Sequence, residues 1–393
     1  MRIASATFYR YSLFFHDVMQ FRSERVQRRD GLIISILSDD GSVGYGEIAP
    51  LPGFSKETLS EAHAAARRCI ESLKLRANID PRVPAGLRDR EMFPPSVRFG
   101  IECALWDLAA RTNNAIPAGF YTAHPAPTVP VNLLLMDHME HVIAHAQAMT
   151  SLGFRALKLK VGRDSMEHDL DRIAQIREAI GRDVEIRIDA NRAWRYDEAM
   201  RFVNKAADHA ISYIEEPLDQ PELLAELAAD SPIPIAVDET LQDAGWEKLF
   251  AWREADVLEA GCDPEFRESV RAELGTLDRG IFDAILAARV WVVKPSLVGM
   301  PLKYTAQLLS RQQRIDADLV ISSSFESGLG LIALANLAAC AGQDALPAGL
   351  DTAASQLGNV LPLPPTQGAF NLAELNAIAA RFNPDSLEVV EDD

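Results

Sequence analysis

The feature that most constrains the fold is an alternation of short apolar strands and amphipathic helices, which begins near Val129 and runs through most of the chain. Units of this length are typical of a parallel sheet covered by helices, because each parallel connection needs a crossover. Strands are expected at 131–135, 156–161, 184–189, 211–215, 233–238, 290–294 and 319–323, with a last one near 348–350. This number favours a closed, TIM-type (β/α) barrel over an open sheet. A doubly wound sheet would also need a Gly-rich phosphate turn after its first strand, and none follows 131–135.

The N-terminal part follows a different pattern. Strands are expected at 2–14 and 31–37 and helices at 57–73 and 96–111, which predicts a separate α+β unit. We therefore expect an α+β domain at 1–125, with the tail 353–393 packing back on it, and a barrel domain at 126–352. The segment 255–288 is long for a barrel connection and is predicted to be an insertion. A solvated helical decoration is the first interpretation of it, and a lid or subunit contact is the alternative.

Charge and cysteine content limit the expected partners. The formal net charge is −18, from 39 basic and 57 acidic side chains, so phosphate backbones and anionic membranes would be repelled. No stretch reaches the about 20 apolar residues of a membrane span. The 4 cysteines lie outside metal-motif spacing, which favours a reduced, cytoplasmic protein. A small molecule is therefore the expected partner, and both a monomer and a homo-oligomer remain open.

Charged side chains stand at the carboxyl ends of the expected barrel strands. These residues are Lys158, Lys160, Asp189, Glu215, Asp238 and Lys294. Lys158 and Lys160 are two residues apart on one strand, so both point to the same face. Because a barrel gathers the carboxyl ends of its strands around one mouth, we expect a ring of three carboxylates with lysines on opposite sides.

The three carboxylates predict a metal site. Asp189, Glu215 and Asp238 would repel one another unless a cation lay among them. A ligand set made only of oxygen atoms, with no neighbouring Cys or His, suits Mg²⁺, with Mn²⁺ as the substitute. Water or substrate would fill the remaining coordination positions.

The lysines predict a base. An unperturbed lysine has a pKa of about 10.4 and is protonated at neutral pH. The like charge of Lys158 beside Lys160, together with a nearby Mg²⁺, favours the neutral amine on one of the two. A neutral lysine can take a proton from the carbon next to a carboxylate, while the metal holds the charge that moves onto that carboxylate. A lattice of structural salt bridges is the alternative, but it does not explain why the charges stand at strand ends.

Several motifs resemble the muconate-lactonizing subgroup of the enolase superfamily. The motifs are Lys158-Leu159-Lys160, Asp189-Ala190-Asn191, Glu215-Glu216-Pro217, Asp238-Glu239, Lys294-Pro295 and Ser96-Val97-Arg98-Phe99-Gly100-Ile101-Glu102. Within the subgroup the chain most resembles the o-succinylbenzoate synthase family, in the segments 28–32, 50–55, 189–194, 321–327 and 349–352. The resemblance implies an enolase-like barrel with an α+β capping domain.

The resemblance also implies roles for single residues. Lys160 would be the base and then the acid that helps hydroxide leave, and Lys294 would stabilise the enediolate. Lys158 would tune Lys160, and Asp189, Glu215 and Asp238 would bind Mg²⁺. The implied substrate contacts and supports are Arg187, Asn191, Ser322, Ser324, Gly349 and Phe54. For Ser322 to Ser324 an ordinary polar strand end remains the alternative, as does a plain turn for residues 50–55.

Three functions compete at this point. The leading one, which the resemblance implies, is Mg²⁺-dependent syn-dehydration of 2-succinyl-6-hydroxy-2,4-cyclohexadiene-1-carboxylate to 2-succinylbenzoate in menaquinone biosynthesis. The second is racemisation of an N-acylamino acid or epimerisation of a dipeptide, which also needs lysines on two faces. The third is an inactive barrel that serves as a binding module, against which the intact ring of ligands argues.

Overall fold

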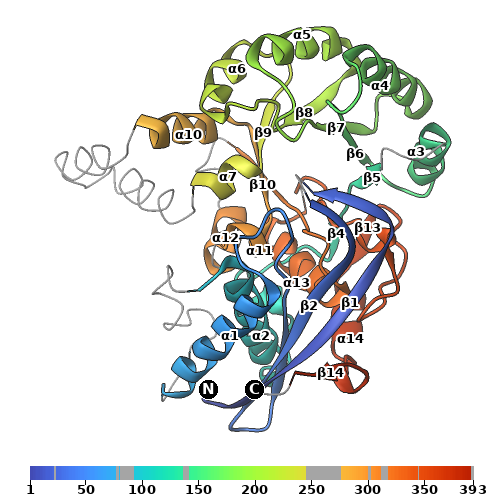
Figure 1. Cartoon of the computed structure of the whole chain (residues 1–393). Helices are drawn as coiled ribbons and strands as arrows, with labels where there is room; N and C mark the ends of the chain where they lie inside the picture. Colours follow the sequence, from blue (N-terminus) through green and yellow to red (C-terminus); the bar gives the residue numbers. More distant parts are fainter. Residues whose placement is uncertain are drawn as a thin grey trace. The chain divides into compact units, whose positions relative to one another are not determined.

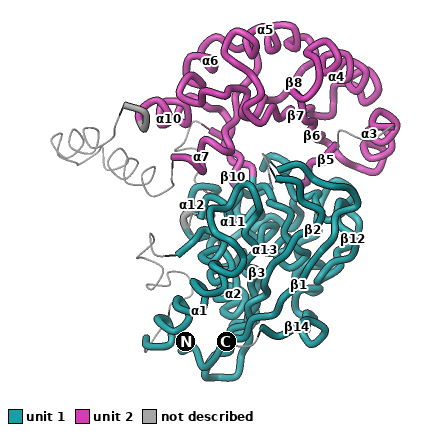
Figure 2. Tube along the Cα trace, viewed as in Figure 1, with its two compact units in different colours: residues 1–130, 294–311, 321–393 teal, residues 131–293, 312–320 magenta. Residues whose placement is uncertain are grey.

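The computed structural model describes residues 1–21, 24–76, 79, 93–135, 141–244, 276–299, 302–310, 317–343 and 345–390. The chain forms two compact units, coloured separately in Figure 2. Unit 1 comprises Met1–Pro130, Lys294–Arg311 and Ile321–Asp393, and unit 2 comprises Val131–Val293 and Gln312–Val320. The predicted division at 125/126 stays a prediction. Unit 1 includes the tail 353–393 together with parts of the segment that was expected to belong to the barrel.

Unit 2 is built on a seven-stranded sheet whose strands follow one another in sequence order. The strands are β5 (Leu133–Leu135), β6 (Ala156–Lys160), β7 (Glu185–Asp189), β8 (Ile211–Glu215), β9 (Ile235–Val237), β10 (Val290–Val293) and β11 (Asp318–Ile321), of which Ile321 counts with unit 1. Pairing is parallel from β5 to β10. The predicted alternation of strands and helices is therefore confirmed in this unit.

Helices connect these strands and lie along the outer side of their curved row (Figure 1). The outer helices are α3 (Val142–Ser151), α4 (Met166–Ile180), α5 (Tyr196–Ala206), α6 (Leu224–Asp230) and α10 (Thr276–Ala287), whereas α7 (Glu239–Ala244) lies at the carboxyl end of β9. α4 illustrates the local logic. Ser165 caps its start by accepting from the N–H of His168, Ile173 and Ile176 are buried, and Gly181 ends it at φ +75°.

Unit 1 has an antiparallel sheet in the order β12-β1-β2-β3, and β14 also pairs with β1. Its strands are β1 (Ile3–Phe21), β2 (Glu24–Ser38), β3 (Val43–Ile48), β12 (Gln356–Leu357) and β14 (Glu388–Val389). A separate two-stranded sheet joins β4 (Thr128–Pro130) to β13 (Ala369–Asn371). The main helices are α1 (Leu59–Lys74), α2 (Pro95–Thr112), α11 (Pro295–Val298), α12 (Leu302–Ser310), α13 (Gly328–Ala338) and α14 (Leu372–Ala379).

Close contact between α2 and β3 depends on glycine. A Cβ atom on Gly46 of β3 would lie 1.9 Å from the carbonyl oxygen of Gly100 on α2, so no larger residue fits there. Around this contact a core forms from α1, α2 and the first strands, with Leu32, Ile34 and Leu105 essentially inaccessible to solvent. The packing explains why the N-terminal part folds as an α+β arrangement.

The first hairpin is longer than the sequence predicted. β1 extends to Phe21 and β2 begins at Glu24, whereas strands were expected only at 2–14 and 31–37. Most of the exposed positions among the added residues carry polar side chains, and a register shift lies between Phe14 and Met19. The buried side chains among them, Phe15, Met19, Phe21 and Val26, do not alternate strictly with exposed ones, so the period-two signal on which the strand prediction rested is broken.

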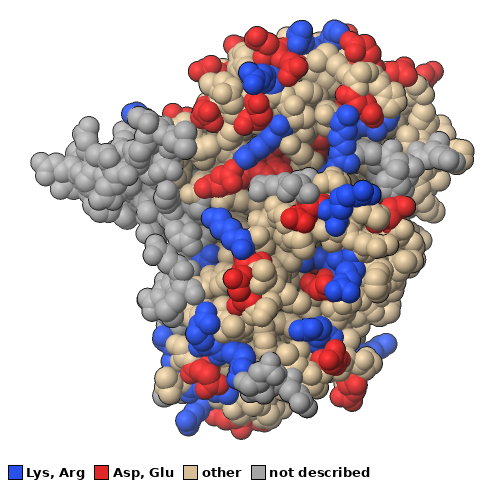
Figure 3. Space-filling model, in the orientation of Figure 1, with Lys and Arg blue, Asp and Glu red and all other residues tan. Residues whose placement is uncertain are grey.

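Other expectations are met in part. The strand expected near 348–350 appears as a single bridge between Ser322 and Gly349. The short helix expected near Trp246 lies outside the described residues, and so does most of the predicted insertion at 255–288. None of the described helices is long and apolar enough to cross a membrane. Basic and acidic side chains are interspersed on the face drawn in Figure 3.

Candidate active site

A row of charged residues crosses three neighbouring strands of unit 2. Lys160 at the end of β6 pairs in register with Asp189 at the end of β7, which pairs in register with Glu215 at the end of β8. Glu215 pairs in turn with Ala236, and Asp238 follows two residues later, directly after β9. Because residues two apart on an extended chain share a face, Asp238 continues the row.

Lys158 binds two of the carboxylates directly. Its Nζ lies 3.0 Å from Oδ2 of Asp189 and 2.8 Å from both carboxylate oxygens of Glu215. Burial alone would lower the pKa of Lys158, but Asp189 and Glu215 outweigh burial and raise the pKa well above its ordinary value. Lys158 therefore carries a positive charge that lies directly against both carboxylates.

Lys160 is held by the segment that follows β7. Its Nζ donates to Oδ1 of Asn191 at 2.9 Å, and Nδ2 of Asn191 donates to Oε1 of Glu239 at 3.1 Å. The backbone N–H of Asn191 also donates to Oδ1 of Asp189 at 3.0 Å. Asn191 thus orients the lysine through its side chain and a carboxylate of the row through its backbone. Asn191, predicted as a substrate contact, lies in this structure against the predicted base.

Arg187 lies one layer below the row. It pairs in register with Lys158 on β6 and Tyr213 on β8, and it is completely buried. Its guanidinium donates to Oε2 of Glu185 at 3.0 Å and to Oδ1 of Asn132 at 3.3 Å, and it lies 5.3 Å from the ring centre of Tyr213. These contacts give Arg187 a supporting position beneath the carboxylates.

One observation indicates that the carboxylate row could bind a divalent cation. The Nζ of Lys158 touches both Asp189 and Glu215, so a single cationic atom can reach ligands on two adjacent strands. Both carboxylates are buried, as is Asp238, and the donor atoms are all oxygen. Asp189, Glu215 and Asp238 could therefore hold a hard cation such as Mg²⁺.

A second acidic group in unit 2 is less suited to this chemistry. Ligand atoms of Asp164, His168 and Asp169 lie within 4.8 Å of one another. Asp164 and His168 are exposed, and Asp169 already accepts from the N–H of Gly162 at 2.7 Å and pairs with Arg172 at 3.1 Å. These contacts show that Asp169 stabilises the loop that follows β6.

The predicted substrate contacts at 322–349 lie in unit 1. Ser322 bridges Gly349, and a Cβ on Gly349 would lie 2.5 Å from Oγ of Ser322, so a larger residue there would displace this hydroxyl. The hydroxyl of Ser324 contacts Oγ of Ser296 at 2.6 Å and Oε1 of Glu326 at 2.8 Å, and Ser324 is buried. These contacts fix the strand end, and the predicted substrate contacts of Ser322, Ser324 and Gly349 stay predictions.

Buried acids that the sequence reasoning missed hold the same segment. Glu47 on β3 accepts from the hydroxyl of Tyr11, from the N–H of Ser327 at 2.9 Å and from the N–H of Gly330 at 3.0 Å. Burial, followed by the nearby charge of Glu326, raises the pKa of Glu47. The sequence offered one signal for this role, which is that Glu47 is an acid on an otherwise apolar strand. A carboxylate buried in such a strand needs several hydrogen-bond donors.

The cap loop, residues 50–55, is a tight turn in unit 1. Its Ser55 N–H donates to the carbonyl of Leu51 at 2.8 Å, and the Leu51 N–H donates to Oγ of Ser55 at 2.9 Å. Gly53 has φ +81°, and a Cβ there would lie 2.6 Å from the carbonyl oxygen of Phe21. The buried guanidinium of Arg29 donates to the carbonyls of Ala49 and Pro50.

The cap loop places Phe54 against Lys294. The Nζ of Lys294 lies 5.9 Å from the ring centre of Phe54, within the range of a cation–π contact. The Phe54 ring also packs edge-on against Phe21, which in turn contacts Phe325. Two predicted site residues that are distant in the sequence, Phe54 and Lys294, are thus brought together.

Replacing Phe54 by alanine is expected to impair turnover or substrate binding. A cation–π contact contributes about 0.5–2 kcal/mol, which corresponds to a loss of roughly 2–30-fold in kcat/KM. The unfolding temperature should stay close to that of the wild type, because Phe54 is only half-buried. Phe54→Tyr keeps the ring and serves as the control in steady-state kinetics. Unchanged kinetics of Phe54→Ala would reduce the cap loop to a plain turn.

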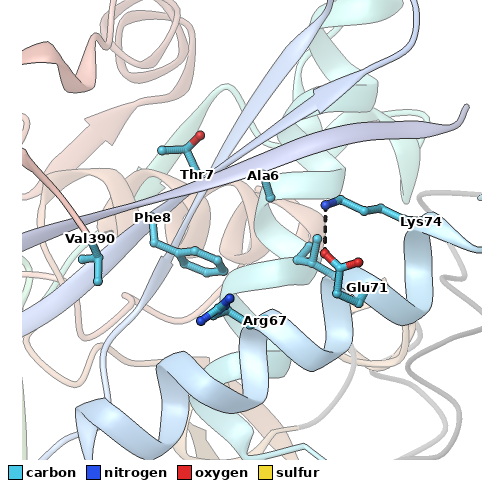
Figure 4. Close-up of a pocket in the computed structure, with 8 residues that line it drawn as sticks. Ala6, Thr7, Phe8, Arg67, Glu71, Lys74 and Val390 are labelled. Carbon is cyan, nitrogen blue, oxygen red and sulfur yellow. Dashed lines mark hydrogen bonds and ion pairs between the residues drawn. The ribbon is translucent and has the colours of Figure 1, made fainter. Parts of the chain in front are cut away.

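A cavity of about 390 Å³ lies in unit 1 between β1 and α1 (Figure 4). Phe8, Ile70 and Val390 are among its apolar lining residues, and Arg67, Glu71 and Lys74 are its charged ones. Lys74 and Glu71 pair with each other at 2.8 Å. None of the predicted site residues lines this cavity, so the cavity takes no part in the chemistry of the charged row.

Comparison with family models covers parts of both units. Residues 3–108 match the model described as "MenC, N-terminal domain", and residues 141–261 match the one described as "Enolase C-terminal domain-like". An o-succinylbenzoate synthase of Pectobacterium atrosepticum is 36% identical over 349 residues, covering 88% of this chain and 89% of that protein. The corresponding protein of Yersinia pseudotuberculosis is 32% identical over 352 residues, covering 88% and 90%.

Solved structures confirm the fold class. An N-succinyl Arg/Lys racemase from Bacillus cereus has a TM-score of 0.77 at 17% identity and covers 100% of both chains. A dipeptide epimerase from Enterococcus faecalis, complexed with Mg and a dipeptide, has a TM-score of 0.74 at 21% identity and covers 95% of this chain and 97% of that one. At this identity the likeness concerns the fold, which is a TIM-type barrel with an α+β capping domain.

Proposed function

This chain belongs to the o-succinylbenzoate synthase family of the enolase superfamily, and on that premise we propose how its residues carry out the dehydration. The substrate is 2-succinyl-6-hydroxy-2,4-cyclohexadiene-1-carboxylate, and the product is 2-succinylbenzoate, in menaquinone biosynthesis. The observation that carries the proposal is the in-register row of Lys160, Asp189 and Glu215 across β6, β7 and β8. The row provides a base beside a carboxylate cluster that suits a cation.

In the proposed mechanism Lys160 acts twice. Its neutral amine takes the proton from the ring carbon that bears the carboxylate, and Asn191 orients it through the hydrogen bond of 2.9 Å. The resulting ammonium then gives a proton to the departing hydroxyl group, which leaves as water while the ring becomes aromatic. One lysine on one face serves both steps, in keeping with a syn elimination.

The other charges hold the substrate and its developing charge. Asp189, Glu215 and Asp238 would hold Mg²⁺, which when bound supplies a Lewis acid for the substrate carboxylate. Lys158 keeps its positive charge against Asp189 and Glu215 and so favours the neutral form of Lys160. We assign Lys294 the task of a permanent cation that stabilises the enediolate. The proposed compartment is the cytoplasm, as the cysteine usage predicts.

A direct assay tests the reaction. The purified chain with Mg²⁺ is offered the cyclohexadiene substrate and, in parallel, single enantiomers of N-succinylamino acids. We expect loss of the diene absorbance and formation of 2-succinylbenzoate. Interconversion of the enantiomers without any dehydration would favour a racemase instead, and inactivity toward both substrates by a folded protein would favour a binding module.

A further inference from the structure

Glu216 stands next to the proposed ligand Glu215 but takes no part in the proposed mechanism. Its side chain is completely buried, and its carboxylate accepts four hydrogen bonds. Oε1 accepts from the backbone N–H of Asp238 and from that of Thr240, both at 2.7 Å. Oε2 accepts from Oγ1 of Thr240 at 2.8 Å and from Nε of Arg192 at 3.1 Å. The residue thus binds the backbone of Asp238, a proposed ligand on the next strand.

Arg192 extends the same network to β7. Its backbone N–H donates to the carbonyl of Glu216 at 2.6 Å, and its Nη2 donates to Oγ1 of Thr240 at 3.1 Å. Nη1 forms an ion pair with Asp243 at 2.7 Å. The segments that follow β7, β8 and β9, which lie side by side in Figure 1, are therefore tied together around one carboxylate.

The backbone at these junctions is strained. The φ values of Asn191, Arg192 and Glu216 are +44°, +62° and +43°. They lie in the left-handed region, which residues other than glycine rarely adopt. Such conformations persist where the surrounding contacts over-determine them, and they gather at functional sites. The strain therefore supports a functional reason for the geometry of the strand ends.

We propose that Glu216 is a positioning residue that, with Arg192 and Thr240, holds the three ligand-bearing strand ends at the spacing one metal ion requires. The inference rests on the proposed function, because it takes Asp189, Glu215 and Asp238 as the ligands. A carboxylate is needed because both of its oxygens face donors. Glutamine would place an NH₂ group against the two backbone N–H groups or against Nε of Arg192.

Metal affinity measured without substrate separates this role from a structural one. Calorimetric titration of the full chain with Mg²⁺ and with Mn²⁺ would give the dissociation constants of wild type, Glu216→Gln, Thr240→Val and Thr240→Ser. We expect binding about 10–100-fold weaker for Glu216→Gln, the usual effect of losing a group that orients metal ligands. Thr240→Val should weaken binding less, and Thr240→Ser, which keeps the hydroxyl, should bind like the wild type.

The matched control is Val203→Ala, which leaves a small cavity in the buried face of α5. It should lower the unfolding temperature and leave the dissociation constants unchanged. The proposal is overturned if Glu216→Gln binds as tightly as the wild type, or if Val203→Ala weakens binding equally at a similar unfolding temperature. If Glu216→Gln fails to fold, equal affinities of Thr240→Val and Thr240→Ser overturn it. A wild type that binds neither metal would overturn the proposed site itself.

Discussion

Lys160→Arg is expected to abolish dehydration, with a loss of about 10²–10⁴-fold or more in kcat. Arginine keeps the positive charge, but its guanidinium does not lose a proton in proteins and so cannot serve as the base. In the wild type the Nζ of Lys160 donates a hydrogen bond to Asn191, whose backbone N–H donates to Asp189. Single-turnover kinetics at saturating Mg²⁺ measures the chemical step.

The same substitution at Lys294 separates the two lysines. Lys294→Arg keeps the permanent charge that its proposed role requires, so we expect it to retain part of the dehydratase activity. If both lysines instead shuttled protons, as in a racemase, either substitution would stop the reaction to the same extent. Lys205→Arg on α5, where the side chain is largely exposed, is the control for a general effect of arginine. An active Lys160→Arg would show that the base has been assigned wrongly.

The row of strand-end charges illustrates what the sequence could predict. Lys160, Asp189 and Glu215 fall one strand–helix unit apart, and parallel strands place their carboxyl ends at one edge of a sheet. The in-register pairs Lys160–Asp189 and Asp189–Glu215 have the expected neighbours. A periodic local pattern was sufficient for this row because the sheet register follows from the repeat itself.

The contacts of the Lys158 side chain could not be predicted from such a pattern. Alternation along β6 places Lys158 and Lys160 on one face but does not say where a four-carbon side chain ends. In the structure Lys158 reaches Asp189 and Glu215, whereas Lys160 reaches Asn191. Asp189 and Glu215 stabilise the charge of Lys158 in these contacts, and the like-charge effect on Lys160 stays a prediction.

The network around Glu216 could not be predicted for a similar reason. Its partners Thr240 and Arg192 lie 24 residues from it, one on either side along the chain, and the hydrogen bonds depend on left-handed backbone at Arg192 and Glu216. Side-chain alternation sends Glu216 to the face opposite Glu215 but does not indicate which residues it meets there. An acid followed by proline immediately after a buried strand was the one available hint.

Ser324 has non-local contacts that the sequence did not predict. The family resemblance implied a substrate contact for Ser324, and an ordinary polar strand end was the alternative. In the structure the hydroxyl of Ser324 lies 2.6 Å from Ser296, which belongs to α11, and 2.8 Å from Glu326. Tertiary partners of this kind have no periodic signal in the sequence.

Removal of the metal is the second large expected effect. Full activity should require Mg²⁺ or Mn²⁺, and excess chelator should abolish dehydration, because the buried carboxylates of Asp189, Glu215 and Asp238 are proposed to act only through the cation they hold. Asp238→Asn removes one anionic ligand and should weaken Mg²⁺ binding by at least the roughly 10–100-fold seen for outer partners of metal ligands. Calorimetry and the Mg²⁺ dependence of kcat measure this directly.

Two features make the test of Asp238 specific. The N–H of Asp238 donates to Glu216 at 2.7 Å and does not depend on the side chain, so Asp238→Asn should keep the local backbone and most of the stability. Asp230→Asn, at an exposed position on α6, removes one negative charge without touching the row and should behave like the wild type. Raising the Mg²⁺ concentration should partly restore Asp238→Asn if the defect is one of affinity. Full activity of the wild type in excess chelator would contradict the metal site. The carboxylates would then have Lys158 as their cationic partner and would need no metal ion.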